Sequence, residues 1–122
     1  MRIVDFYSGF EGEDEIVLSF VNGNEVVTVR MWESYFGNLI KAIRIQDYMH
    51  LPNTLFSIYN TTEGGWYDQD EWEVNDVTLF RSQLVSVDVT QLESTESEIV
   101  NLLISLLDNF QEHELRIFIS LR

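Results

Sequence analysis

The sequence predicts a single α+β domain over residues 1–122, in which a mostly antiparallel sheet of five or six strands packs against two or three helices. Three observations lead to this prediction. Short alternating segments typical of strands are interleaved with segments of helical periodicity. Apolar residues make up 45% of the chain, which is enough for one hydrophobic core. The Asn22-Gly23 pair between two alternating segments is a turn signal, so it predicts a hairpin and antiparallel pairing.

The beginning of the chain holds three predicted strands. Residues 2–7 form the first strand, and an acidic loop over residues 9–15, with two glycines and four acids, follows it. Residues 15–21 alternate between apolar and polar positions and predict the second strand. Residues 25–32 are rich in β-branched side chains and return as the third strand after the turn.

A helix is predicted over residues 34–49, with Ser34 as a candidate N-cap. Its apolar residues recur at the spacing of one helix face, at Phe36, Leu39, Ile40 and Ile43. The helix should end before Pro52, because a residue that precedes proline is disfavoured in helical conformation. Residues 54–60 then predict a further strand.

The segment after residue 75 is less clear in its pattern. Residues 76–83 have apolar residues at helical spacing, so they allow a short helix with Asp76 as its cap, but the pattern is ambiguous. Residues 84–89 alternate cleanly, and this alternation predicts a strand.

The last part of the chain predicts a long helix and a terminal strand. Thr95 and Glu98 match a capping box, and a wide apolar face continues behind them to about residue 110. Residues 115–121 are apolar on both faces, which indicates a strand in a central position.

The net charge of −14, from 21 acids and seven bases, limits the possible partners. A surface of this charge repels nucleic-acid phosphates and anionic membranes, so we expect neither as a direct partner. We find neither a run of about 18 apolar residues nor a secretory signal. The absence of cysteine excludes disulfides and thiol catalysis and is compatible with the cytoplasm, where we expect the protein to act. Acidity also aids solubility, which is the simpler interpretation of the charge.

Residues 63–76 are the most distinctive stretch, because six carboxylates and three large aromatics occur there without any Lys or Arg. Two interpretations are open. The stretch could be a solvated acidic loop with its aromatics folded onto the core, or a loop that docks onto a basic protein. Tyr and Trp are enriched among the residues that dominate binding energy at interfaces, which favours docking.

The candidate partner-binding residues come from this stretch and from the earlier acidic loop. They are Trp66, Tyr67, Asp68, Asp70, Glu71, Trp72 and Glu73 from the first, and Glu11, Glu13 and Asp14 from the second.

No motif in the sequence indicates a reaction. The two histidines, His50 and His113, have no neighbours spaced as in a catalytic triad or a zinc site. Asp68 and Asp70 begin like a calcium loop, but the glycine and the final glutamate of that loop are missing. Phosphate-binding glycine motifs are absent as well. We therefore expect a protein that is not an enzyme and has no catalytic residue, metal site or cofactor.

In size, acidity and its acidic-aromatic stretch, the chain resembles bacterial immunity proteins of contact-dependent inhibition and polymorphic toxin systems. The resemblance implies a non-enzymatic inhibitor that neutralises a cognate toxin, often a nuclease. We also expect a monomer when the protein is free, because the sequence shows one apolar core set and no second hydrophobic patch. One alternative is an acidic decoy of the phage type, which mimics nucleic acid to block a host nuclease or defence complex. Decoys of that kind spread carboxylates along a face, whereas here they cluster beside aromatics. A small enzyme or a structural adaptor is the third class.

Overall fold

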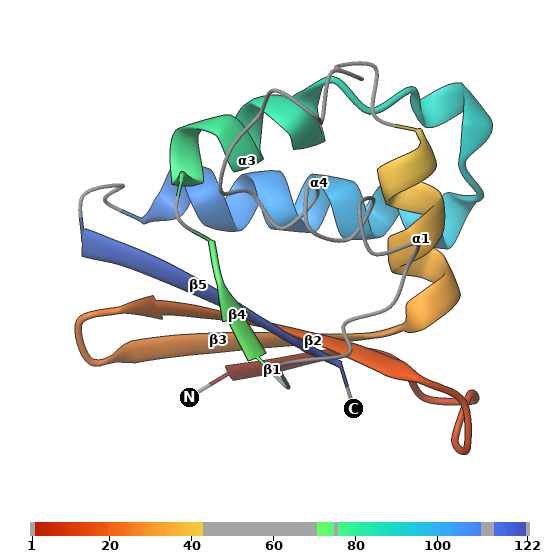
Figure 1. Cartoon of the computed structure of the whole chain (residues 1–122), viewed down its shortest axis with the longest axis horizontal. Helices are drawn as coiled ribbons and strands as arrows, with labels where there is room; N and C mark the ends of the chain where they lie inside the picture. Colours follow the sequence, from red (N-terminus) through yellow and green to blue (C-terminus); the bar gives the residue numbers. More distant parts are fainter. Residues whose placement is uncertain (1, 43–70, 75, 111–113, 122) are drawn as a thin grey trace.

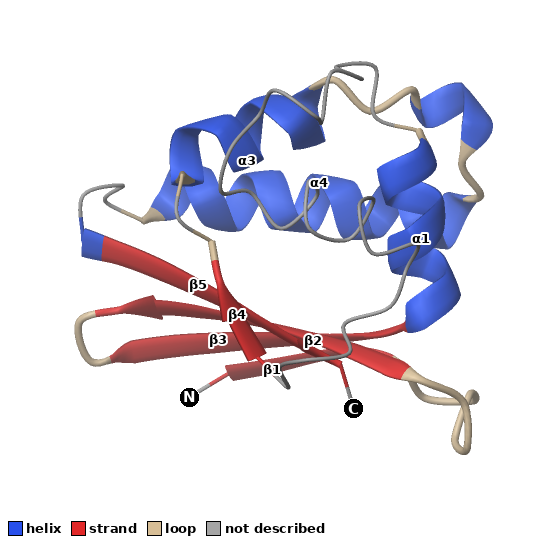
Figure 2. Ribbon diagram, in the orientation of Figure 1, coloured by secondary structure: helices blue, strands red, loops and turns tan. Residues whose placement is uncertain are grey.

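The computed structural model describes residues 2–42, 71–74, 76–110 and 114–121. The chain folds into two layers, with helices α1, α3 and α4 on one face of a sheet (Figures 1 and 2). The strands are β1 (Arg2–Phe6), β2 (Glu15–Asn22), β3 (Glu25–Trp32), β4 (Glu71–Glu73) and β5 (Leu115–Leu121). The helices are α1 (Glu33–Lys41), α3 (Val77–Val85) and α4 (Ser94–Asn109), with a 3-10 turn, η2, at Val89–Gln91. The predicted α+β class is confirmed.

The five strands have the order β1-β3-β2-β5-β4, and the sheet is mixed. Three of the pairings are antiparallel, but β1 runs parallel to β3. The parallel pair arises because the chain leaves β1 beside Met31, passes over the end of β3, and enters β2 at Glu15 opposite Trp32. The loop at residues 7–14 therefore bridges the junction between β3 and α1.

The hairpin predicted around Asn22-Gly23 is confirmed. Strands β2 and β3 pair antiparallel from Glu15↔Trp32 to Asn22↔Glu25. Gly23 adopts a φ of 60°, a left-handed conformation that glycine reaches without a steric penalty. Strand β5 has a neighbour on each side, so the predicted central position of residues 115–121 is also confirmed.

One hydrophobic core fills the space between the sheet and the helices. The side chains of Leu18, Phe20 and Val29 on the sheet are fully buried, as are Ile99 and Leu103 on α4. Side chains at alternate strand positions face the core, and those at helical spacing on α4 face them. Burying apolar surface of this kind is the main favourable term in folding.

The predicted starts of the first and the last helix are wrong in detail. Helix α1 begins at Glu33 rather than after Ser34, and the N–H of Glu33 donates to the Asp14 carbonyl at 3.0 Å. Helix α4 begins at Ser94, so Thr95 and Glu98 do not form its capping box. The carboxylate of Glu96 accepts the N–H of Glu93 instead, at 2.9 Å. A contact distant in sequence accompanies the start of α1, whereas a local capping box between Glu93 and Glu96, just before the predicted pair, fixes the start of α4.

The strand predicted at residues 84–89 is wrong, and the helical alternative at residues 76–83 is confirmed. Helix α3 continues to Val85, and η2 follows at Val89–Gln91. The Asp76 side chain accepts the N–H of Leu79 at 2.9 Å and so caps the helix as predicted. The alternation of valines misled the prediction because Val85 and Val89 are exposed rather than buried on one sheet face.

The loop predicted at residues 63–76 is wrong in part, because Glu71–Glu73 form strand β4 at the edge of the sheet. Charged residues are common on edge strands, where they discourage pairing with other chains, so acidity did not exclude a strand here. The C-terminal part of the predicted helix, residues 43–49, and the predicted strand at residues 54–60 lie outside the described residues.

Candidate protein-docking surface

The loop at residues 7–14 projects beyond the end of the sheet (Figure 1) and has a defined backbone. Two successive turns shape it, in which Phe10 donates to the Tyr7 carbonyl at 3.0 Å and Glu13 donates to the Phe10 carbonyl at 2.9 Å. Gly9 and Gly12 have φ values of 99° and 97°, which other residues rarely adopt. The conformation is therefore specified by the sequence of the loop itself.

Side chains at the base of the loop hold it further. The Asp5 carboxylate accepts the backbone N–H of Tyr7 at 2.7 Å and that of Ser8 at 3.0 Å. The Tyr7 hydroxyl donates to the carbonyl of Glu13 across the loop. These bonds connect the start and the end of the loop, so its acidic residues are held in fixed positions relative to the sheet.

Three aromatic rings form a cluster under the loop. Phe10 stacks on Trp32 with ring centroids 4.4 Å apart and planes 10° apart. Tyr35 meets both rings edge to face, at 5.5 Å from Phe10 and 5.4 Å from Trp32. All three side chains are half-buried, so each also contributes to the surface. The cluster joins the loop, the end of β3 and the first turn of α1.

Three exposed carboxylates lie on the same loop as Phe10. Glu11, Glu13 and Asp14 are all exposed on the loop. The N–H groups of Glu11 itself and of Gly9 hydrogen-bond the Glu11 carboxylate and hold its pKa below the ordinary value, so it is ionised at neutral pH. We call the six residues the acidic-aromatic patch: Phe10, Trp32 and Tyr35 with Glu11, Glu13 and Asp14.

Among the described residues, the base that lies beside the loop, Arg30, is already paired. The sequence has no Lys or Arg between Arg2 and Arg30. Arg30 forms an ion pair with Glu15 across the β2–β3 pair, and this hydrogen bond raises the pKa of Arg30. Its guanidinium also lies over the Tyr7 ring, 5.6 Å from the centroid. The carboxylates of the patch therefore keep their charge for an external partner.

Strand β4 brings part of the acidic stretch predicted at residues 63–76 to the same end of the sheet. Glu71 pairs with Ser120, which pairs with Val17 near the start of β2. Since neighbouring strands lie about 4.8 Å apart, Glu71 is about 10 Å across the sheet from the strand that leaves the loop. The exposed Glu71 thus extends the negative surface towards the β4 edge.

Glu73 differs from Glu71 because it has a basic partner in this chain. Its two carboxylate oxygens accept from Arg116 at 3.0 and 2.8 Å, and this interaction lowers the pKa of Glu73. The Arg116 guanidinium also lies over the Phe118 ring, 5.0 Å from its centroid. A bidentate pair of this kind has a defined geometry, so Glu73 is less available to a partner than Glu71.

The remaining predicted residues of the stretch are Trp66, Tyr67, Asp68 and Asp70, which lie outside the described residues. For Trp72 only the backbone is described, and it pairs with Ile119. Of the ten predicted partner-binding residues, the structure thus brings Glu11, Glu13 and Asp14 together on one loop and places Glu71 two strands away from the start of β2.

Sequence reasoning missed the aromatic half of the patch. Phe10 was visible only as one apolar residue among the acids of its loop, and Trp32 as the last residue of a strand. The cluster depends on strand order, for which the sequence has no short signal: β1 and β2 are not neighbours, so their connection crosses the end of β3, where Trp32 lies.

The structure offers little else that indicates chemistry. Within the described residues, we find no group of three or more His, Asp or Glu side chains that could hold a metal ion. Among the helices described, none has the length and apolarity needed to cross a membrane. No family model, curated protein or solved structure matches this chain. The acidic-aromatic patch is therefore the best candidate for a functional surface.

Proposed function

We propose that this protein is an acidic inhibitor of the immunity-protein kind, which binds a cognate basic toxin in the cytoplasm and occludes its active-site cleft. The toxin of this proposal is a nuclease, and the inhibitor acts as a monomer without catalysis of its own. The observation that supports the proposal most is the acidic-aromatic patch, in which a hydrogen-bonded loop presents three exposed carboxylates and contributes Phe10 to an aromatic cluster.

The charge of the patch indicates the chemistry of its partner. Glu11, Glu13 and Asp14 are exposed, and the nearest described base, Arg30, is paired with Glu15. An unbalanced cluster of one sign attracts a surface of the opposite sign and accelerates encounter with it. A nuclease carries Lys and Arg around its active site to hold phosphates, so it offers such a surface.

The aromatic rings supply binding affinity that the charges alone do not provide. Exposed ion pairs contribute little affinity, about 0–1 kcal/mol each, because water and salt screen them. Trp and Tyr provide large rigid contact areas and are frequent energetic hot spots. Trp32 and Tyr35 are half-buried and fixed by packing, so they lose little conformational entropy when a partner covers them.

The rigidity of the loop also favours a docking role. Its turns and the Asp5 and Tyr7 hydrogen bonds hold the carboxylates before any partner arrives. A preorganised surface binds more tightly than a flexible one with the same groups, since less ordering remains to be done. In this proposal Glu71 contributes to the rim of the interface, and Trp66, Tyr67, Asp68 and Asp70 remain predicted contacts.

The proposal is tested with the protein encoded by the gene next to that of this chain. Purified inhibitor is titrated into a nuclease assay of that neighbouring protein, and the complex is weighed by light scattering. We expect complete inhibition at a ratio of one to one and a complex with one copy of each chain. Neutralisation at sub-stoichiometric ratios would mean that the protein is an enzyme, and an absence of binding would refute the immunity assignment.

The decoy alternative predicts a different pattern in the same assay. A nucleic-acid mimic inhibits several unrelated nucleases with similar affinity, because it offers charge rather than shape. The inhibitor proposed here should discriminate strongly, since its aromatic contacts require a complementary surface. A commercial ribonuclease and a commercial deoxyribonuclease serve as controls, and equal inhibition of both would favour the decoy.

A further inference from the structure

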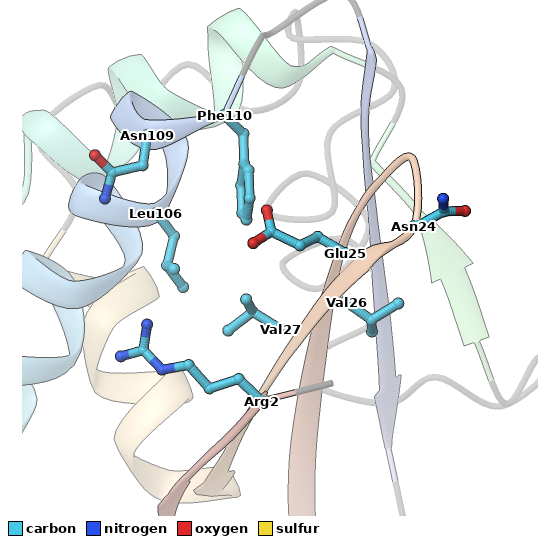
Figure 3. Close-up of a pocket in the computed structure, with 8 residues that line it drawn as sticks. All are labelled: Arg2, Asn24, Glu25, Val26, Val27, Leu106, Asn109 and Phe110. Atoms are coloured by element: carbon cyan, nitrogen blue, oxygen red, sulfur yellow. The ribbon is translucent and has the colours of Figure 1, made fainter.

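A pocket of about 480 Å³ opens where the beginnings of β1 and β3 approach the C-terminal end of α4 (Figure 3). Its apolar wall consists of Val27 on the sheet and Leu106 and Phe110 at the end of the helix. The volume lies in the range of pockets that hold small ligands, about 300–1,000 Å³. The pocket is at the opposite end of β1 from the acidic-aromatic patch.

Two opposite charges line this pocket. Arg2 of β1 pairs with Val27, and Glu25 precedes Val27 by two residues on β3, so both side chains lie on the face towards the helices. Figure 3 shows the Arg2 guanidinium and the Glu25 carboxylate on either side of Val27, reaching towards the space beside Leu106 and Phe110. The register of the parallel pair therefore places both charges at one cavity.

Neither charge is paired within the part of the chain that the structure describes. Arg30, Arg81 and Arg116 each form an ion pair with a carboxylate. Arg2 forms none there, although Glu25 is a diagonal neighbour within the reach of long side chains. The pocket thus combines an apolar wall with a cation and an anion that do not neutralise each other.

We propose that the pocket binds a small zwitterion, namely an α-amino acid with an apolar side chain. The Arg2 guanidinium has the planar fork that receives a carboxylate through two hydrogen bonds. The Glu25 carboxylate accepts from the ammonium group on the same carbon, and the apolar side chain lies against Val27, Leu106 and Phe110. Phosphate ligands fit less well, because Glu25 lies in the pocket and the whole chain has a net charge of −14.

The site is independent of the proposed inhibitor function, so its test uses the free protein. Isotope-labelled protein is titrated with L-leucine, with leucinamide and with N-acetylleucine, and amide shifts are followed by NMR. We expect L-leucine to shift the resonances of Val27, Leu106 and Phe110. The two analogues each lack one charge, so they should bind at least about tenfold more weakly. Equal binding of all three compounds, or no shifts at millimolar L-leucine, would overturn the proposal.

Variants separate a binding role from a structural one. Arg2→Gln should weaken L-leucine at least about tenfold and bring it level with leucinamide, since both then lack the guanidinium contact. Glu25→Gln should likewise weaken L-leucine to the level of N-acetylleucine, since neither compound then has a charged contact for its nitrogen. Arg81→Gln, which changes the same charge on α3 outside the pocket, should leave binding unchanged. If Arg2 only stabilises the C-terminal end of α4, Arg2→Gln will lower the stability of the fold, and none of the three compounds will bind to the unsubstituted protein. In that case the proposal fails.

Discussion

The packing of Phe10 on Trp32 is one of the contacts that hold the acidic loop against the rest of the fold, and a double-mutant cycle measures it. Phe→Ala and Trp→Ala substitutions cost about 3–5 kcal/mol at fully buried sites. Because both side chains are only half-buried, we expect Phe10→Ala and Trp32→Ala each to lower the free energy of unfolding by about 2 kcal/mol. The stacked geometry at 4.4 Å adds a coupling energy of about 1 kcal/mol between the two positions.

The cycle is measured by urea unfolding followed by far-UV circular dichroism, because the tryptophan change removes a fluorescence probe. A control cycle pairs Trp32→Ala with Phe118→Ala, a half-buried ring on β5 that does not belong to the cluster. Distant substitutions add to within about 0.5 kcal/mol. If the Phe10–Trp32 cycle is as additive as this control, the ring stack does not hold the loop, and the claim that the aromatic cluster preorganises the patch is wrong.

Three further predictions concern stability. Glu96 is buried and accepts from Asn38 at 2.7 Å as well as from the Glu93 N–H, so Glu96→Ala should cost about 3 kcal/mol in urea unfolding. Gln83 is fully buried without a hydrogen-bond partner among the described residues. Gln83→Met should therefore raise the free energy of unfolding by about 1 kcal/mol, which thermal unfolding would show as a higher midpoint. Arg116 and Arg81 lower the pKa values of Glu73 and Asp108, respectively. The two ion pairs therefore stabilise the fold fully above the unfolded-state pKa values of the carboxylates, and this stabilisation is lost as pH falls through their lower folded-state pKa values. A Glu73→Gln/Asp108→Asn variant lacks both carboxylates, so on acidification below about pH 5 it should lose less stability than the parent.

Local patterns were sufficient for the elements whose partners lie close in sequence. The β2–β3 hairpin follows from alternation and from the Asn22-Gly23 turn. The long helix α4 follows from its apolar face. In these cases the residues that determine the element lie within the element itself, so a short sequence window contains the necessary information.

The failures occurred where distant residues decide. Helix α1 starts at Glu33 because the carbonyl of Asp14, many residues earlier, accepts its N–H. The start of α4 at Ser94 is the exception, because the capping box between Glu93 and Glu96 is local, although Glu96 also binds Asn38 of α1. The alternating valines at residues 84–89 satisfied the strand pattern, yet the helical face of Phe80 and Leu84 packs into the core and extends α3 through Val85.

The candidate site was predictable in its charge and not in its shape. Composition alone identified Glu11, Glu13 and Asp14 as acids without nearby bases. The aromatic cluster beneath them depends on the crossing of residues 7–14 over the end of β3, which follows from strand order. Strand order is set by the whole sheet, and no short pattern encodes it.

The most direct test of the proposed function is the rate at which the partner associates with matched charge variants. Glu13→Gln/Asp14→Asn removes two exposed charges from the acidic-aromatic patch, and Glu25→Gln/Glu98→Gln removes two exposed charges elsewhere. Stopped-flow association is measured at several salt concentrations, after each variant is checked for folding. We predict that the patch variant associates about fivefold more slowly and with a weaker salt dependence, while the control variant behaves nearly as the parent does. Equal effects of the two variants would show that only net charge matters, and would contradict a docking role for the patch.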